Sequence, residues 1–189
     1  MEADWAVEVG PDLPSIDVPW EGFVDLRQNP SAANALAETA QHPALRDALI
    51  ALNSAQSPVF TSKCDLWSLT RAEIDPDEFN SAPENAREGI ASYIDLLQLD
   101  SARLASFDFH EHWARSLTGH LKAVKQTNGR VDLVLRPATV DSVSGYGITL
   151  YAAGCGAGTR AANAAWEAVL RAAVAVTMNL GLSPALTGE

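Results

Sequence analysis

The sequence predicts an α+β domain in which helices pack on one face of a mostly antiparallel sheet. Some segments alternate apolar and polar residues, which is the strand period, and others carry apolar stripes at helical spacing. The composition is that of a globular protein, with 47% hydrophobic and 20% charged residues. We expect a single domain over residues 1–189, because domains typically have about 100–200 residues. The helices expected to cover the sheet lie at residues 83–97, 101–125 and 159–180.

The first third of the chain is predicted to hold strands, turns and two short helices. Alternation at residues 5–9 indicates a first strand, proline-rich loops follow, and residues 23–26 are a candidate second strand. One helix is expected from Pro30 to about Thr39. Another begins near Pro43 and places three leucines on one face. Residues 59–69 are rich in β-branched and aromatic side chains and predict a central strand.

Two helices are predicted in the middle of the chain. Ser81 and Glu84 have capping-box spacing, in which the two side chains satisfy backbone N–H groups of a first helical turn. The helix at 83–97 would carry an apolar stripe of Ala86, Ile90, Tyr93, Ile94 and Leu97. The helix at 101–125 would bury Trp113, Leu117, Leu121 and Val124.

The last third predicts a β–β–α unit. A strand at residues 131–136 is expected to end at Pro137, because proline cannot donate to a strand ladder. The return strand has one face made of Tyr146, Ile148, Leu150 and Ala152. A long helix from Thr159 to about Leu180 should pack on that face through Ala162, Trp166, Val169, Ala173 and Val176. We expect this unit to be the stability core.

The charge balance limits the partners. The chain has 13 basic and 24 acidic residues, a net charge of −11, whereas nucleic acids and anionic membranes attract a positive surface. We therefore expect no nucleic-acid binding and no membrane association. The sequence shows no secretory signal and no apolar stretch long enough to span a bilayer. It predicts a soluble cytoplasmic protein with Cys64 and Cys155 as reduced thiols.

Three glycines precede the last helix, at Gly154, Gly156 and Gly158. Such glycines let a backbone approach a phosphate, and a helix N-terminus attracts anions. The segment resembles the first motif of Rossmann-type methyltransferases, which implies a cofactor site, but only nine residues follow Leu180 to build its opposite wall. It is also similar to the end of double-stranded-RNA-binding domains, without their lysines at the helix start. We prefer close packing of helix on sheet as the explanation, and expect no cofactor.

A histidine segment is the second candidate site. On a strand, Asp108, His110 and His112 would share a face and could bind a metal ion. On a helix, residues two apart point nearly opposite ways, so the two histidines would diverge. The flanking sequence favours a helix. That interpretation leaves a surface pair and a hydrogen-bonded core histidine at His120.

Strand aspartates are the third candidate. Asp25, Asp65 and Asp132 each lie in a predicted strand, and carboxylates that converge from strands hold Mg²⁺ in RNase H-like nucleases. An RNase H-like mixed sheet is therefore the alternative fold. Lys63 could lower the pKa of the neighbouring Cys64 thiol, although a buried structural cysteine fits the predicted strand better.

Two classes of function follow. The first is a non-catalytic protein that acts through self-association, as a homo-oligomer, or through a protein partner. The second is a metal-dependent hydrolase or nuclease using the histidine segment or the strand aspartates.

Overall fold

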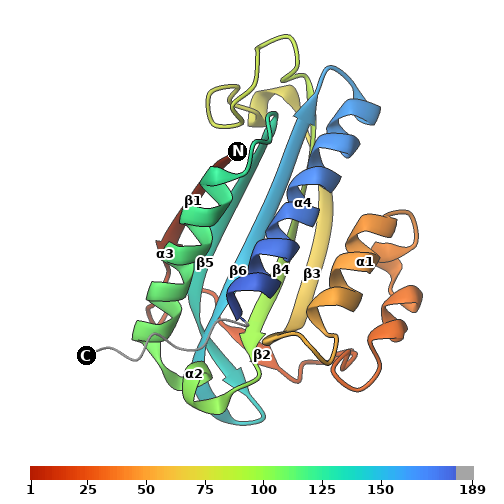
Figure 1. The fold of residues 1–189 in the computed structure, drawn as a ribbon. Coiled ribbons are helices and arrows are strands. Elements are labelled where there is room, and N and C mark those ends of the chain that lie inside the picture. Colours follow the sequence, from red (N-terminus) through yellow and green to blue (C-terminus); the bar gives the residue numbers. More distant parts are fainter. Residues whose placement is uncertain (182–189) are drawn as a thin grey trace.

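A mixed six-stranded sheet forms the centre of the computed structural model, which describes residues 1–181 (Figure 1). The strands are β1 (Glu2–Val7), β2 (Ile16–Val18), β3 (Val59–Leu69), β4 (Glu88–Gln98), β5 (Gly129–Val140) and β6 (Val143–Gly156). The helices are α1 (Pro43–Leu52), α2 (Ser101–Ala105), α3 (Phe107–Ala123) and α4 (Thr159–Gly181). Three 3-10 turns complete the set, η1 (Pro30–Ala35), η2 (Ala37–Thr39) and η3 (Arg71–Glu73).

The sheet has the strand order β1-β5-β6-β4-β3, with β2 continuing the β1 edge beside β5. The pairs β5–β6, β6–β4 and β4–β3 are antiparallel, whereas β1 and β2 run parallel to β5. This arrangement confirms the predicted α+β class. Helices α1, α3 and α4 all lie on the same face of the sheet (Figure 1).

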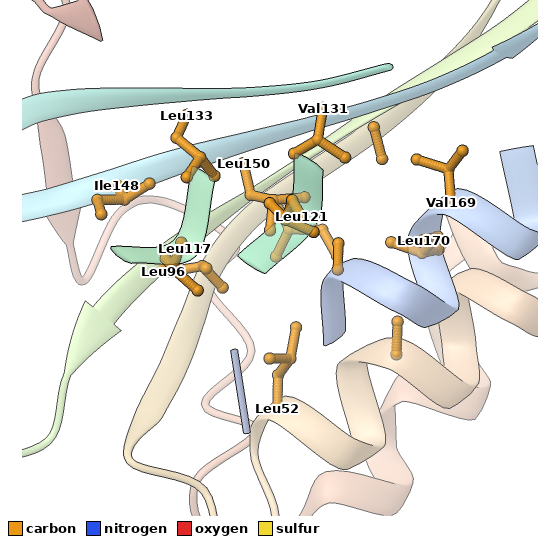
Figure 2. Close-up of a cluster of buried hydrophobic side chains, with 14 of the residues drawn as sticks. Leu52, Leu96, Leu117, Leu121, Val131, Leu133, Ile148, Leu150, Val169 and Leu170 are labelled. Carbon is orange, nitrogen blue, oxygen red and sulfur yellow. The ribbon is translucent and has the colours of Figure 1, made fainter. Parts of the chain in front are cut away.

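The main core fills the space between the sheet and these helices. Figure 2 shows apolar side chains from α1, α3 and α4 meeting those of β4, β5 and β6. Ile148, Leu150 and Ala152 of β6 and Trp166 and Val169 of α4 belong to this core, as the alternation predicted. The indole nitrogen of Trp166 also donates to Ser92 Oγ at 2.9 Å, so this large side chain leaves no unsatisfied donor.

The predicted helix at residues 83–97 is wrong, because this segment contains strand β4. Ile90 and Ile94 face the helices, and Tyr93 and Leu97 face the other side. Two residues that are four positions apart lie on the same face of a helix. They also lie on the same face of a strand, because every second residue of a strand points to the same side. Because β4 is buried on both faces, its apolar run mimics a helical stripe. The third covering helix is instead α1.

Other boundaries also differ from the predictions. The strand at 59–69 is β3, which lies at the edge of the sheet rather than at its centre. The second strand is β2, and residues 23–26 form no strand. The strand β5 continues through Pro137 to Val140. The carbonyl of Leu135 accepts a hydrogen bond from Glu8 N, so Leu135 points its backbone groups toward the β1 edge. Pro137 lies two residues further and points its ring nitrogen to the same edge. At that position neither β1 nor β2 pairs with β5, so the missing N–H of proline costs no ladder hydrogen bond.

Two segments fold over the ends of the sheet face opposite α1, α3 and α4, and Leu104 of the short helix α2 packs with the first of them. At one end, Ile16 and Val18 of β2 and Phe23 pack on Phe60 and Leu97. At the other, Ile74 and Phe79 of the β3–β4 connection pack on Cys155. The middle of this face remains uncovered by the described residues. None of the described helices is both long and apolar enough to cross a membrane.

Candidate functional site

The three glycines before α4 lie where helix and sheet touch. A Cβ atom on Gly154 would come within 2.1 Å of the backbone nitrogen of Trp166, and one on Gly156 within 2.4 Å of that of Ala162. The first two glycines therefore belong to strand β6 and to its contact with α4. Only Gly158, at the turn, has open space around its Cβ position.

The histidine segment lies in helix α3, where His110 and His112 diverge. His110 is fully buried and His112 is exposed, beside an exposed Asp108. His110 Nδ1 donates to the Ser106 carbonyl at 2.8 Å, and burial lowers the pKa of the imidazole, partly offset by this hydrogen bond. The expected core histidine at His120 is wrong, because His120 is exposed. In residues 1–181 no group of three or more His, Cys, Asp or Glu could hold a metal ion.

The strand aspartates do not meet. Asp25 lies in a loop and forms an ion pair with Arg27 at 2.8 Å, and the hydrogen bonds from Arg27 lower the pKa of its carboxyl group. Asp65 is on β3 and Asp132 on β5, with β4 and β6 between them. Three strand spacings put their Cα atoms roughly 14 Å apart.

The uncovered middle of the sheet face is rich in aromatic and charged side chains. We call it the open strip and define it by Trp67, Tyr93, Tyr151, Asp132 and Arg136. The ring centroids of Trp67 and Tyr93 are 6.4 Å apart, and those of Tyr93 and Tyr151 are 5.9 Å apart. Trp67 is 37% exposed, so a large aromatic surface faces outward at the β3 edge.

A hydrogen-bond network lies beside the aromatic row. Arg136 donates to Glu8 at 2.8 Å, to Tyr151 Oη at 3.3 Å and to Thr149 Oγ1 at 3.4 Å. The Thr149 hydroxyl donates in turn to Asp95 at 2.6 Å. Asp95 is only 5% exposed, and its burial raises the pKa of the carboxyl group. The network holds Arg136 and Tyr151 in defined positions beside the aromatic row.

A cavity of about 310 Å³ adjoins the strip at the β3 edge, and we call it the bulge pocket. The strand register shifts between Thr61 and Cys64, which leaves Ser62 and Lys63 without paired residues on β4. The pocket wall combines apolar and polar side chains: Trp20, Val24, Leu26, Leu36, Glu38, Leu49, Thr61, Ser62, Lys63, Cys64 and Tyr93, with Gly22.

The reactive groups in this region are held in unreactive forms. Burial, together with the charges of Glu38, Asp65 and Asp95, raises the pKa of the Cys64 thiol to about 12. The thiolate is the nucleophilic form, so Lys63 does not activate this cysteine. Burial likewise raises the pKa of Tyr93 to about 12. The region therefore offers shape, aromatic surface and charge, which are the elements of recognition.

Only part of this site could be predicted from the sequence. Asp132 was singled out as a candidate ligand, and the outward positions of β5 and β6, which include Arg136, Thr149 and Tyr151, follow from the alternation that placed their neighbours in the core. The pattern around Tyr93 predicts a helical stripe, so its position on the sheet could not be predicted.

Comparison of the chain with protein-family models, with curated proteins and with solved structures gives no match.

Proposed function

We propose that this protein is a non-catalytic binding domain whose open strip docks a protein partner with a basic surface. The observation that carries the proposal is the row of contacting rings formed by Trp67, Tyr93 and Tyr151 on the face that the helices leave free. Tryptophan, tyrosine and arginine are the residues that contribute most often to protein–protein binding energy. Rigid aromatic side chains also lose little conformational entropy when they are covered.

The charges around the row favour a basic partner. Across the strands, Asp65 lies opposite Tyr93, Tyr93 opposite Tyr151, Tyr151 opposite Asp132, and Asp132 opposite Asp4. Asp132 forms an ion pair at 2.6 Å with Arg130, which also pairs with Glu78 at 2.8 Å. Within the described chain Asp65 and Asp4 form no ion pair, so a negative charge remains at each end of the aromatic row. A second copy of the chain would present the same charges and a net charge of −11, which opposes self-association.

The alternative of a metal-dependent hydrolase has less support, because its candidate ligands lie on separate elements. The same negative charge leads us to expect no binding to nucleic acid. The alternative occupant of the open strip is a second copy of the chain, and the test below distinguishes it from a protein partner.

The test selects peptides from a displayed library of random short sequences and measures their affinity by fluorescence anisotropy. The selected peptides should combine aromatic residues with Lys or Arg. Trp67→Ala should weaken binding by about tenfold or more, which corresponds to a central interface residue. Leu99→Ser is the matched control, because Leu99 is also an exposed apolar side chain, at 51%, outside the strip.

Two results would overturn the proposal. One is equal binding of the selected peptides to the parent and to Trp67→Ala. The other is sedimentation of the parent as a dimer that Trp67→Ala dissociates, which would make the occupant a second copy.

A further inference from the structure

The bulge pocket has the size and wall of a small-molecule site. Its volume of about 310 Å³ is at the lower end of the range for ligand pockets, roughly 300–1,000 Å³. Five of the twelve wall residues are leucine, valine or tryptophan. Trp20 and Val24 are 36% and 41% exposed, so apolar surface at the pocket is still in contact with water. An apolar molecule that filled the pocket would remove that surface from water.

The β3 bulge supplies the polar part of the pocket. Thr61 accepts a hydrogen bond from Asn53 at 2.8 Å at the end of α1, and Cys64 packs against the main core. These residues are three apart, and on a regular strand they would face opposite sides. The bulge lets both face the helices and leaves Ser62 and Lys63 to line the pocket.

Among the described residues Ser62 has no hydrogen-bond partner and Lys63 has no ion pair, although the charge of Lys63 acts on Asp95. Ser62 Oγ is buried and has no hydrogen-bond partner among residues 1–181. Such a group is costly to bury unless something satisfies it. Lys63 forms no ion pair with any described carboxylate, and its ammonium group lies 5.3 Å from the centre of the Trp20 ring. A cation and a hydroxyl on consecutive residues provide donors for a carboxylate.

Lys63 has to outweigh the negative charges around the pocket for an anion to bind there. Cys64 and Tyr93 are neutral at physiological pH, but Asp65 and Asp95, which lie outside the wall, act on both of these groups, so anion binding depends on Lys63. Glu38 is the one acidic residue in the described wall; it is exposed, whereas Lys63 is half-buried, so Glu38 lies at the rim.

We propose that the bulge pocket binds a small carboxylic acid with an apolar body, whose carboxylate contacts Lys63 and Ser62 and whose body lies among Trp20, Val24 and Leu49. This site is separate from the docking of a protein partner. Tyr93 lines the pocket and also belongs to the open strip, so the two sites are neighbours.

The test compares three compounds with one body: 3-phenylpropionate, 3-phenylpropionamide and 3-phenylpropylamine. Binding is measured by isothermal titration and by saturation-transfer NMR. The carboxylate should bind about tenfold more tightly than the amide, because its hydrogen bonds are charge-assisted, and the amine should bind least. The change in intrinsic fluorescence, to which all five tryptophans contribute, should follow the same order.

Variants locate the site. Lys63→Met should reduce affinity for the carboxylate about tenfold while leaving that for the amide unchanged, so retained amide binding reports an intact pocket. Ser62→Ala should weaken both compounds. Lys122→Met, at an exposed lysine on α3, should change neither. The proposal is wrong if none of the compounds binds, if the amine binds best, or if Lys63→Met binds the carboxylate as the parent does.

Discussion

Gly154→Ala is expected to destabilise the protein by about 3 kcal/mol, the upper part of the range for overpacked cores. The new Cβ atom would lie 2.1 Å from the backbone nitrogen of Trp166 and 2.6 Å from its Cα. Backbone atoms cannot rotate away as a side chain does, so α4 itself would have to move. That movement would disturb the contacts of Trp166, Val169 and Ala173 with the sheet. For a protein of this size, about 3 kcal/mol lowers the melting temperature by about 6–12 °C.

The measurement is urea unfolding followed by tryptophan fluorescence and circular dichroism. Gly119→Ala is the matched control. Gly119 lies in α3 with no atom within 4 Å of its Cβ position, so alanine should stabilise the helix by roughly 0.5–1 kcal/mol. If Gly154→Ala unfolds at the same urea concentration as the parent, the close contact between β6 and α4 is wrong. If it folds normally but releases a bound small molecule, the glycines serve a ligand.

Three further predictions concern single side chains. Trp166→Ala should lower the free energy of unfolding by about 3–5 kcal/mol, measured in urea, because it empties a fully buried site. Burial raises the pKa of Asp95 above its unfolded value of 3.8, so the parent should lose stability relative to Asp95→Asn as the pH rises from below 4 through the folded pKa. Urea unfolding of both proteins at pH 3.5 and pH 7 measures this loss. A stability difference that does not change with pH would contradict the prediction. With a pKa of about 12 instead of 9, the Cys64 thiol should form roughly a thousandfold less thiolate at pH 8, so mass spectrometry should show Cys64 alkylated by iodoacetamide far more slowly in the native protein than in urea.

The terminal β–β–α unit could be predicted because its elements each present one buried face. Ile148 and Leu150 alternate with outward-facing residues, and the face of α4 that contains Trp166 repeats at helical spacing. In both elements the spacing of apolar residues along the chain matches the face that is buried, so the sequence pattern is enough to predict the element.

Strand β4 could not be predicted because most residues on both of its faces are buried. The helix face is buried under α4, and the other face is partly buried under β2 and the β3–β4 connection. A strand buried on both sides shows no polar alternation. The spacing of Ser81 and Glu84 then suggested a helix start. The true capping box lies earlier, at Thr70 and Glu73 of η3.

The bulge pocket depends on contacts that no local pattern contains. Its wall joins Trp20, which precedes the first helices, to Lys63 of β3 and Leu49 of α1. The bulge itself is one shift of register between Thr61 and Cys64, and it changes which residues face the core. The predicted strand at 59–69 was correct, but its register was not readable from alternation alone.

The parallel pairing of β1 with β5 has a consequence for how the chain folds. Glu8 and Arg136 are hydrogen-bonded across 128 positions of sequence, whereas β5, β6 and α4 follow one another directly. Local units close quickly and distant pairings close late, so β5 should spend part of folding with a bare backbone edge. During synthesis β1 leaves the ribosome well before β5, its partner strand. At high protein concentration we expect that edge to accept β1 from another molecule, which would give a domain-swapped dimer that keeps the pairing of β1 with β5.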